Sequence, residues 1–203
     1  MSALACLVVA LAQPALAQRR QVLLGGIIGY SRAEFIGNDA TASESRTSTL
    51  AGAFVRIPLA SWFSLEPELL FARKGGASKA TPAQPATVAF DIVYLETPLL
   101  ARFTGPRMIK ILRLLAFAGP SAGFKIGCDI ETNQAGSNTR TPCDDALVAS
   151  VDYSAVFGGG LEAHVGNSAL GVEVRYSYGL KKLLSDGTDV RNGQLGILAE
   201  IPF

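Results

Sequence analysis

Apolar and polar residues alternate in short segments along this chain, and the alternation is clearest at residues 194–203. Leu195, Ile197, Ala199, Ile201 and Phe203 fall on one side there, and Gln194, Gly196, Leu198, Glu200 and Pro202 fall on the other. A period of two residues is typical of a β-strand with one apolar face. At the edge of a soluble sheet such a strand would invite aggregation, whereas a closed barrel needs a last strand that pairs with the first. The segment therefore predicts the closing strand of a barrel.

Seven more segments repeat the alternation, at residues 22–35, 49–58, 63–72, 88–103, 111–126, 151–165 and 170–178. The connections between them are alternately long and short. Four long loops (residues 37–48, 73–87, 127–150 and 180–192) would lie at one end, and three short turns with both termini at the other. Small bacterial outer-membrane barrels show this asymmetry, with the long loops outside the cell. We predict an all-β fold, an eight-stranded antiparallel up-and-down transmembrane β-barrel.

Composition agrees with this fold and narrows the function classes. The 203 residues fit one domain, and 49% of them are hydrophobic. Beyond the N-terminal region no run of roughly 18 uncharged apolar residues is present, as a transmembrane helix would require. A net charge of +1 gives no basic face for nucleic acid. Residues 4–11 form an apolar core before Ala15-Leu16-Ala17, which predicts a signal peptide over residues 1–17 and a barrel domain over residues 18–203.

Three prolines fall inside predicted strands: Pro67, Pro98 and Pro120. Each removes one hydrogen bond from a ladder, and a closed barrel has no free edge to accommodate the loss. We therefore expect β-bulges at these positions.

Aromatic residues recur near the ends of the apolar faces. The segment from Phe63 to Phe71 would cover roughly 20 Å along the membrane normal, close to the height of an apolar band between two aromatic girdles. The predicted membrane-interface aromatics are Phe63, Phe71, Phe103, Tyr178 and Phe203.

The opposite faces of the strands carry charges, which a barrel would enclose. The acids are Glu66, Glu68, Glu96, Glu162, Glu173 and Glu200, and the bases are Arg56, Arg102, Arg113, Arg175 and Lys125. Unpaired charges in a narrow lumen would be costly, so the near balance of signs favours an ion-pair network that fills the barrel. The alternative is a gated polar path for small ions or solutes, although a selective pore would carry an excess of one sign.

Two cysteines remain beyond the predicted signal peptide. Cys128 and Cys143 flank a predicted loop, and an exported protein would pair them in a disulfide worth about 3 kcal/mol on the chain-entropy model, with two free thiols as the alternative. No further Cys or His lies near them to complete a metal site.

No residue set predicts catalysis or a cofactor. His164 is the only histidine, and Glu162 is near it in sequence, but no nucleophile accompanies them. We expect no catalytic, cofactor-binding or metal-binding residues.

A group of cations, Arg73, Lys74, Lys79, Lys181 and Lys182, falls at the predicted outer rim or in its loops. We expect a solvated face there, and contact with lipopolysaccharide phosphates is the alternative hypothesis.

Three segments resemble the PorT-like outer-membrane β-barrel family. They are Leu65-Glu66-Pro67-Glu68-Leu69-Leu70-Phe71 followed by Arg73-Lys74-Gly75, the segment Tyr94–Phe103, and Gly119-Pro120-Ser121-Ala122-Gly123. The resemblance extends over about residues 25–203 and places prolines at the same points. It implies a barrel in the outer membrane of a Gram-negative bacterium, with outer-membrane lipid and the barrel-assembly machinery as partners.

The expected function is a structural or surface-interaction role with an unknown extracellular partner. Three alternatives stay open. A narrow channel would conduct. An outer-membrane enzyme would need a nucleophile and an orienting acid at the same rim as the single histidine. A soluble lipocalin-like carrier would turn its apolar faces inward.

Overall fold

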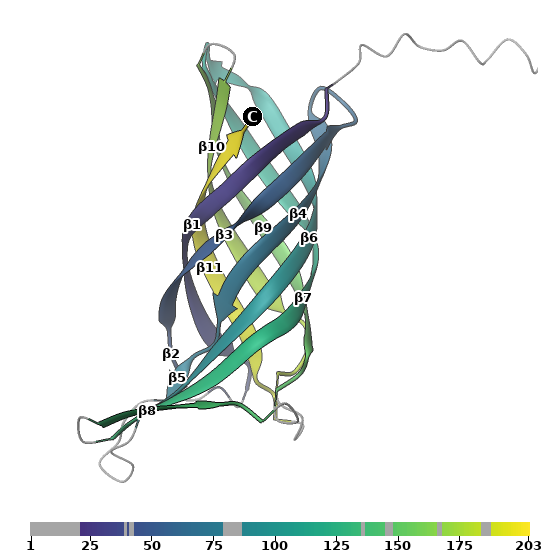
Figure 1. The fold of residues 1–203 in the computed structure, drawn as a ribbon. Helices are drawn as coiled ribbons and strands as arrows, with labels where there is room; N and C mark the ends of the chain where they lie inside the picture. The colour runs from purple at the N-terminus through teal and green to yellow at the C-terminus, as the bar shows by residue number, and fades with distance from the viewer. Residues whose placement is uncertain are drawn as a thin grey trace, which may run out of the picture.

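The protein is described by a computed structural model that covers residues 21–38, 40, 43–78, 87–134, 137–144, 148–165, 168–183 and 188–203. Eight long strands form a closed barrel (Figure 1). They are β1 (Leu23–Ile36), β3 (Arg46–Pro58), β4 (Phe63–Lys74), β6 (Thr87–Ile109), β7 (Leu112–Gln134), β9 (Val151–Val165), β10 (Ser168–Gly179) and β11 (Arg191–Pro202). The predicted signal peptide, residues 1–17, lies outside the described residues.

Every neighbouring pair of ring strands is antiparallel, and the ring closes between the first and last strands. Gly25 of β1 pairs with Pro202 of β11, and β6 pairs with β7 on the opposite side of the ring. The predicted fold class is therefore confirmed. No helix among the described residues is long and apolar enough to cross a membrane.

Side chains alternate between the outside and the inside of the barrel, as the period of two predicts. Leu69, Leu99 and Ile197 point outward and are 49%, 48% and 60% exposed. Glu68, Glu96 and Arg175 point inward and are 5%, 3% and 4% exposed. The barrel is thus apolar outside and charged inside, the reverse of a soluble carrier.

Apolar side chains also pack inside the barrel, around the charged groups. One cluster joins Ile27, Leu50, Phe54, Leu70, Ala72 and Leu198, and a second joins Leu100, Leu115, Phe117 and Val156. We call a third cluster the mouth cap: Ile92, Tyr94, Val148, Leu183 and Val190. In the mouth cap, residues of two long connections pack over inward-facing residues of β6, at the end of the barrel opposite the C-terminus (Figure 1).

The sheet continues beyond the ring at this same end. Short strands β2 (Ser43–Glu44), β5 (Ala77–Ser78) and β8 (Ser137–Pro142) pair with one another or with the extended ends of β6 and β7. The prediction of a long loop over residues 127–150 is therefore wrong for its first half, which forms the hairpin of β7 and β8. Both faces of this hairpin are polar, so no apolar period marks it in the sequence.

The three prolines do not produce bulges, so that prediction is wrong. At Pro67, Pro98 and Pro120 the pairing with the preceding ring strand lapses for two residues and then resumes in the same register. Each proline keeps its pairing with the following ring strand, so the missing N–H interrupts only one ladder. The register shifts of the β6–β7 pair lie elsewhere, at Val93/Tyr94, Thr104/Arg107 and Arg107/Ile109.

Candidate functional site

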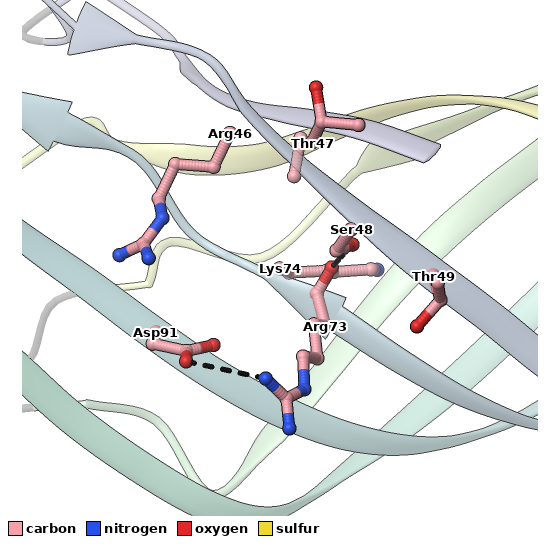
Figure 2. A pocket seen from close by; sticks show the side chains of 8 residues that line it. Arg46, Thr47, Ser48, Thr49, Arg73, Lys74 and Asp91 are labelled. Atoms are coloured by element: carbon pink, nitrogen blue, oxygen red, sulfur yellow. Dashed lines mark hydrogen bonds and ion pairs between the residues drawn. The ribbon is translucent and has the colours of Figure 1, made fainter. Parts of the chain in front are cut away.

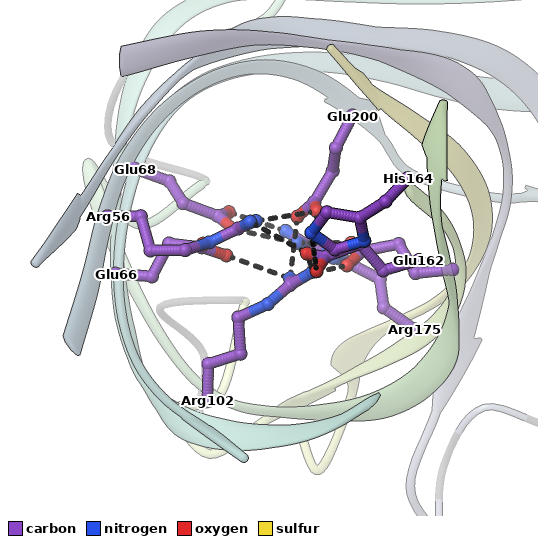
Figure 3. Close-up of polar contacts among 9 residues, drawn as sticks. Arg56, Glu66, Glu68, Arg102, Glu162, His164, Arg175 and Glu200 are labelled. Carbon is purple, nitrogen blue, oxygen red and sulfur yellow. Dashed lines mark hydrogen bonds and ion pairs between the residues drawn. The ribbon is translucent and has the colours of Figure 1, made fainter. Parts of the chain in front are cut away.

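Charged side chains from six of the ring strands meet in the centre of the barrel (Figure 3). We call this group the lumen ion cluster: Arg56, Glu66, Glu68, Arg102, Glu162, Glu173, Arg175 and Glu200. All eight are buried, and they reach the centre because the pleat turns alternate residues of each strand inward.

Two arginines hold the inner part of the cluster together. Arg102 is fully buried and pairs with Glu200 at 2.9 Å, Glu66 at 3.2 Å, Glu162 at 3.4 Å and Glu173 at 3.7 Å. Arg56 shares three of these partners, pairing with Glu66, with Glu200 at 2.8 Å and with Glu162 at 3.0 Å. Each of those carboxylates therefore bridges two guanidinium groups.

Arg175 extends the cluster toward the outer end of the barrel. Its two terminal nitrogens donate to the two carboxylate oxygens of Glu68 at 2.6 and 2.8 Å, a planar bidentate pair. It also donates to Glu173 at 2.5 and 2.9 Å. Because Glu173 lies 3.7 Å from Arg102 as well, this carboxylate links the two parts of the cluster.

Aromatic rings support two of these arginines. The Arg56 guanidinium carbon lies 4.9 Å from the ring centre of Phe54, and that of Arg175 lies 5.3 Å from Phe117. Each ring lies over a glycine of the neighbouring strand. A Cβ at Gly25 would lie 2.3 Å from the Phe54 ring, and one at Gly158 would lie 2.6 Å from the Phe117 ring. Glycine at these positions therefore permits the close approach.

A second polar group, which we call the outer lumen site, consists of Lys74, Glu96, Asp152 and Asn192. The buried Lys74 ammonium pairs with Glu96 at 2.5 Å and with Asp152 at 3.5 Å. Asn192 donates to Asp152 at 2.9 Å. The expectation of a solvated Lys74 is wrong, because β4 continues to Lys74 and the pleat turns its side chain inward.

The predicted lumen residues are thus brought together only in part. Glu96 joins the outer lumen site, and Lys125 donates to the carbonyl of Val148 at 3.0 Å. Arg113 is half-buried, and no ion pair joins it to another described residue. Seven carboxylates are buried in the two lumen groups against four cations, an acid excess that the near balance in the sequence did not indicate. Sequence reasoning missed Asp152 and Asn192, which lie at the start of strands next to predicted loops.

The carboxylate oxygens of Glu66, Glu68 and Glu200 lie within 4.8 Å of one another, close enough for metal ligands. All three are bonded to buried guanidinium groups. At the edge of the cluster, His164 lies 3.4 Å from Glu162 and is 35% exposed. The chemistry of this set is ion pairing among the protein's own side chains.

The hairpin of β7 and β8 carries the disulfide between Cys128 and Cys143, as the sequence predicted. On the same hairpin, exposed Arg140 pairs with Asp129 at 2.7 Å, Asp91 at 3.5 Å and Glu131 at 3.9 Å. The hydrogen bond to Asp129 raises the pKa of Arg140 above its usual value. Nearby carboxylates therefore balance the charge of this exposed arginine.

A cavity of about 120 Å³ opens at the outer rim between β3, β4 and β6 (Figure 2). We call it the rim pocket; it is lined by Ala33, Arg46, Thr47, Ser48, Thr49, Arg73, Lys74 and Asp91. Arg46 pairs with Glu131 at 2.9 Å, yet its other terminal nitrogen is buried without a hydrogen-bond partner among the described residues. Arg73 lies 3.8 Å from Asp91. The pocket thus combines two guanidinium groups with three hydroxyls and one opposing carboxylate.

Aromatic side chains lie on the outer face at both ends of the strands. Phe63 and Phe103 pack at 5.2 Å between ring centres, and Trp62, which directly precedes β4, stacks on Phe103 at 6.0 Å. Phe71, Tyr178 and Phe203 are exposed on the same outer face.

A family model described as "Outer membrane protein beta-barrel domain" matches residues 12–185. The chain belongs to this family. Membership places this outer-membrane barrel with its apolar outer face in lipid, and it agrees with the general resemblance found in the sequence.

Solved structures of other small barrels cover most of this outer-membrane protein at low identity. Neisserial surface protein A (NspA) is 15% identical over 89% of this chain and 97% of its own, with a TM-score of 0.52. Ail, the attachment invasion locus protein of Yersinia pestis, is 14% identical over 90% and 99%, with a TM-score of 0.45. The N-terminal β-barrel domain of Pseudomonas aeruginosa OprF is 14% identical over 87% and 97%, with a TM-score of 0.39. No protein of curated function matches the sequence.

Proposed function

We propose that this protein is a non-enzymatic barrel in the outer membrane of a Gram-negative bacterium, closed by its own side chains, that acts at the cell surface through its extracellular end. The observation that carries this proposal is the lumen ion cluster, in which eight buried side chains from six strands meet at the centre. The mouth cap adds an apolar layer between this cluster and the outside.

The contacts within the lumen favour a plug over a conducting path. A permeant ion would have to displace guanidinium–carboxylate pairs at 2.6–3.0 Å, which lie in the low-dielectric interior of the barrel. Breaking a buried pair leaves an uncompensated charge, which raises the free energy. Each ion that crosses the barrel would have to overcome this free-energy cost.

Conductance in a planar bilayer tests the plug. We expect a flat current trace from protein whose folding is verified by its heat-modifiable gel mobility. The matched variant combines Arg102→Ala with Glu66→Ala, which removes one fully buried pair without changing the net charge, and it should give measurable current. Discrete conductance steps from the unmodified protein would favour the narrow channel instead.

The extracellular hairpin is the part of the surface best suited to hold a partner. Strand β8, Ser137–Pro142, is exposed along its whole length and pairs only with β7 among the described strands. Its free backbone groups can pair with an extended segment of another protein, the mode called β-augmentation. The disulfide joins the two strands of this hairpin, which reduces the entropy lost when a partner binds.

Trypsin treatment of intact cells tests which end faces outward. We expect cleavage at Arg140 and at Lys181 or Lys182, and protection of Arg107 and Lys110, which lie at the opposite end between β6 and β7. Cleavage confined to Arg107 and Lys110 would reverse the proposed orientation and remove the hairpin as a surface site.

The rim pocket supports a second contact, with the phosphate groups of lipopolysaccharide. Guanidinium groups and hydroxyls are the usual protein donors to phosphate oxygens, and Arg46 has a buried N–H group without a partner among the described residues. Arg46→Gln with Arg73→Gln should reduce the thermal stabilisation produced by added lipopolysaccharide. Arg107→Gln with Arg113→Gln, the same charge change at the other end, should not. Equal losses in both variants would contradict a specific site.

Three finer points belong to the same proposal. Export by a signal peptide predicts a mature N-terminus at Gln18, which N-terminal sequencing of the membrane protein would test. Depletion of the barrel-assembly machinery should lower the amount of folded protein.

The PorT-like affiliation is supported by the segments Leu65–Phe71 and Tyr94–Phe103. The prolines of these segments lie where the pairing with the preceding ring strand is interrupted.

A further inference from the structure

An apolar groove of about 430 Å³ lies on the outer face of the barrel, across β1, β3 and β4. Its outward-facing lining is Leu24, Ala53, Val55, Pro67, Leu69 and Phe203. Gly25, Phe54 and Glu68, which alternate with these residues along the same strands, also line it. The floor of the groove is therefore the backbone of the barrel wall.

The groove coincides with the lapse in pairing at Pro67. Backbone pairing between β3 and β4 is present at Phe54–Glu68 and again at Ile57–Leu65, but it is absent for the two positions between them. Proline has no N–H to offer to β3, so the two strands are not held together there. Small residues widen the space: a Cβ at Gly26 would meet nothing closer than 4.0 Å, and one of those nearest atoms belongs to the ring of Phe203.

The surroundings of the groove decide what can occupy it. It faces the apolar outer surface of an outer-membrane barrel, where water is excluded and the only abundant small partner is lipid. Between apolar surfaces in a membrane, association depends on van der Waals contact rather than on the hydrophobic effect. A groove with apolar side chains of three strands around it offers an alkyl chain contacts on several sides, which a flat strand surface does not.

We propose that this groove is a binding site for one acyl chain of a membrane phospholipid. Leu24 and Phe203 lie at the end of the barrel where the chain termini and short turns lie, so the leaflet rests on the proposed function: with the orientation proposed above, the phospholipid belongs to the periplasmic leaflet. The site is distinct from the rim pocket at the other end and does not depend on the role proposed for the extracellular hairpin.

A substitution that fills the groove tests the site, with a matched control on the same strand. Ala53→Phe places a ring in the groove, whereas Ala51→Phe adds the same ring two residues away on the same outward face, outside the lining. Protein refolded with phosphatidylethanolamine is exchanged into detergent and examined by native mass spectrometry. We expect a phospholipid adduct on the unmodified protein and on Ala51→Phe, and its loss from Ala53→Phe. No adduct on the unmodified protein, or equal retention by both variants, would overturn the proposal.

A second measurement keeps the test valid if Ala53→Phe does not fold. The chain has a single tryptophan, so Ala51→Trp in a Trp62→Phe background places a reporter beside the groove without filling it, and Leu195→Trp places one on another part of the outer face. Phospholipid with brominated acyl chains quenches both. Quenching at Ala51→Trp should saturate at a lower fraction of brominated lipid than at Leu195→Trp. Identical curves would show ordinary lipid contact at both positions and overturn the site.

Discussion

Two arginines in this molecule have similar partners and opposite surroundings. Arg102 pairs with four carboxylates in the lumen ion cluster and is fully buried. Arg140 of the β7–β8 hairpin pairs with three carboxylates, two on β7 and one on β6, and its side chain is 55% exposed. Water and salt can replace the partners of Arg140, but nothing can replace those of Arg102 while the barrel stays folded. The comparison indicates that exposure, rather than the number of ion pairs, decides what each charge contributes.

The largest effect should follow removal of the buried charge. Arg102→Met keeps an unbranched side chain but leaves Glu66, Glu162, Glu173 and Glu200 with fewer cations in a dry lumen. We expect the free energy of unfolding to fall by about 3–5 kcal/mol. Urea titration of the refolded protein in detergent or lipid vesicles, followed by tryptophan fluorescence, measures it.

Arg113→Met is the control for this change, because Arg113 is half-buried and pairs with no described acid. Adding Glu200→Gln to Arg102→Met should recover part of the loss, since one uncompensated carboxylate becomes neutral. An unchanged urea midpoint in Arg102→Met would mean that the buried pairs add nothing to stability.

The second-largest effect should follow removal of the disulfide, and it should be confined to the stability of the hairpin. Cys128 and Cys143 are separated by 15 positions, so replacing both with serine removes about 3 kcal/mol of loop constraint on the chain-entropy model. Local opening should then expose Arg140 to trypsin roughly 100-fold faster, while the urea midpoint of the barrel stays the same. A fall in the barrel midpoint would show that hairpin and lumen are coupled.

A smaller loss is expected at the outer lumen site. Lys74→Met removes the cation shared by Glu96 and Asp152, although Asn192 still donates to Asp152. The free energy of unfolding should fall by about 2 kcal/mol, again from the urea midpoint. Lys181→Met, an exposed lysine next to β10, is the control and should leave that midpoint unchanged. A similar midpoint in the two variants would place Lys74 among solvated charges.

The smallest effect should come from the exposed arginine. Arg140→Gln should not change the urea midpoint at physiological salt, because Asp129 and Glu131 remain partly hydrated without it and Asp91 keeps Arg73 as a partner. At low ionic strength a small decrease in hairpin protection against proteases should become measurable. A loss as large as that of Arg102→Met would remove the distinction between the two arginines.

The strands and their orientation could be predicted from the sequence because the barrel wall separates two very different environments. Lipid outside and charge inside impose a period of two on every ring strand, and the alternation assigns Glu68 and Ile197 to the correct faces. The same physics hides the strands beyond the ring. Residues 129–134 and 137–142 are polar on both sides apart from Ile130, so no apolar face alternates along them.

Which charges pair could not be predicted, because pairing depends on register and strand length. Lys74 was assigned to the rim because a Gly- and Ala-rich segment follows it, yet β4 extends one more inward position. Arg113 is the cross-strand partner of Glu162, yet the Glu162 carboxylate pairs with Arg56 and Arg102 instead. Lys125 donates to the carbonyl of Val148. At each proline, the pairing with the following ring strand maintains the register. The sequence of one strand does not reveal this pairing.

Glu200 lies on β11, yet its carboxylate pairs with Arg56 of β3 and Arg102 of β6. Both cations also pair with Glu66 of β4 and Glu162 of β9, so the last strand brings a third shared carboxylate to a charge network that earlier strands can begin. Ring closure therefore joins the last strand to β3 and β6 through the interior as well as to β1 through its backbone.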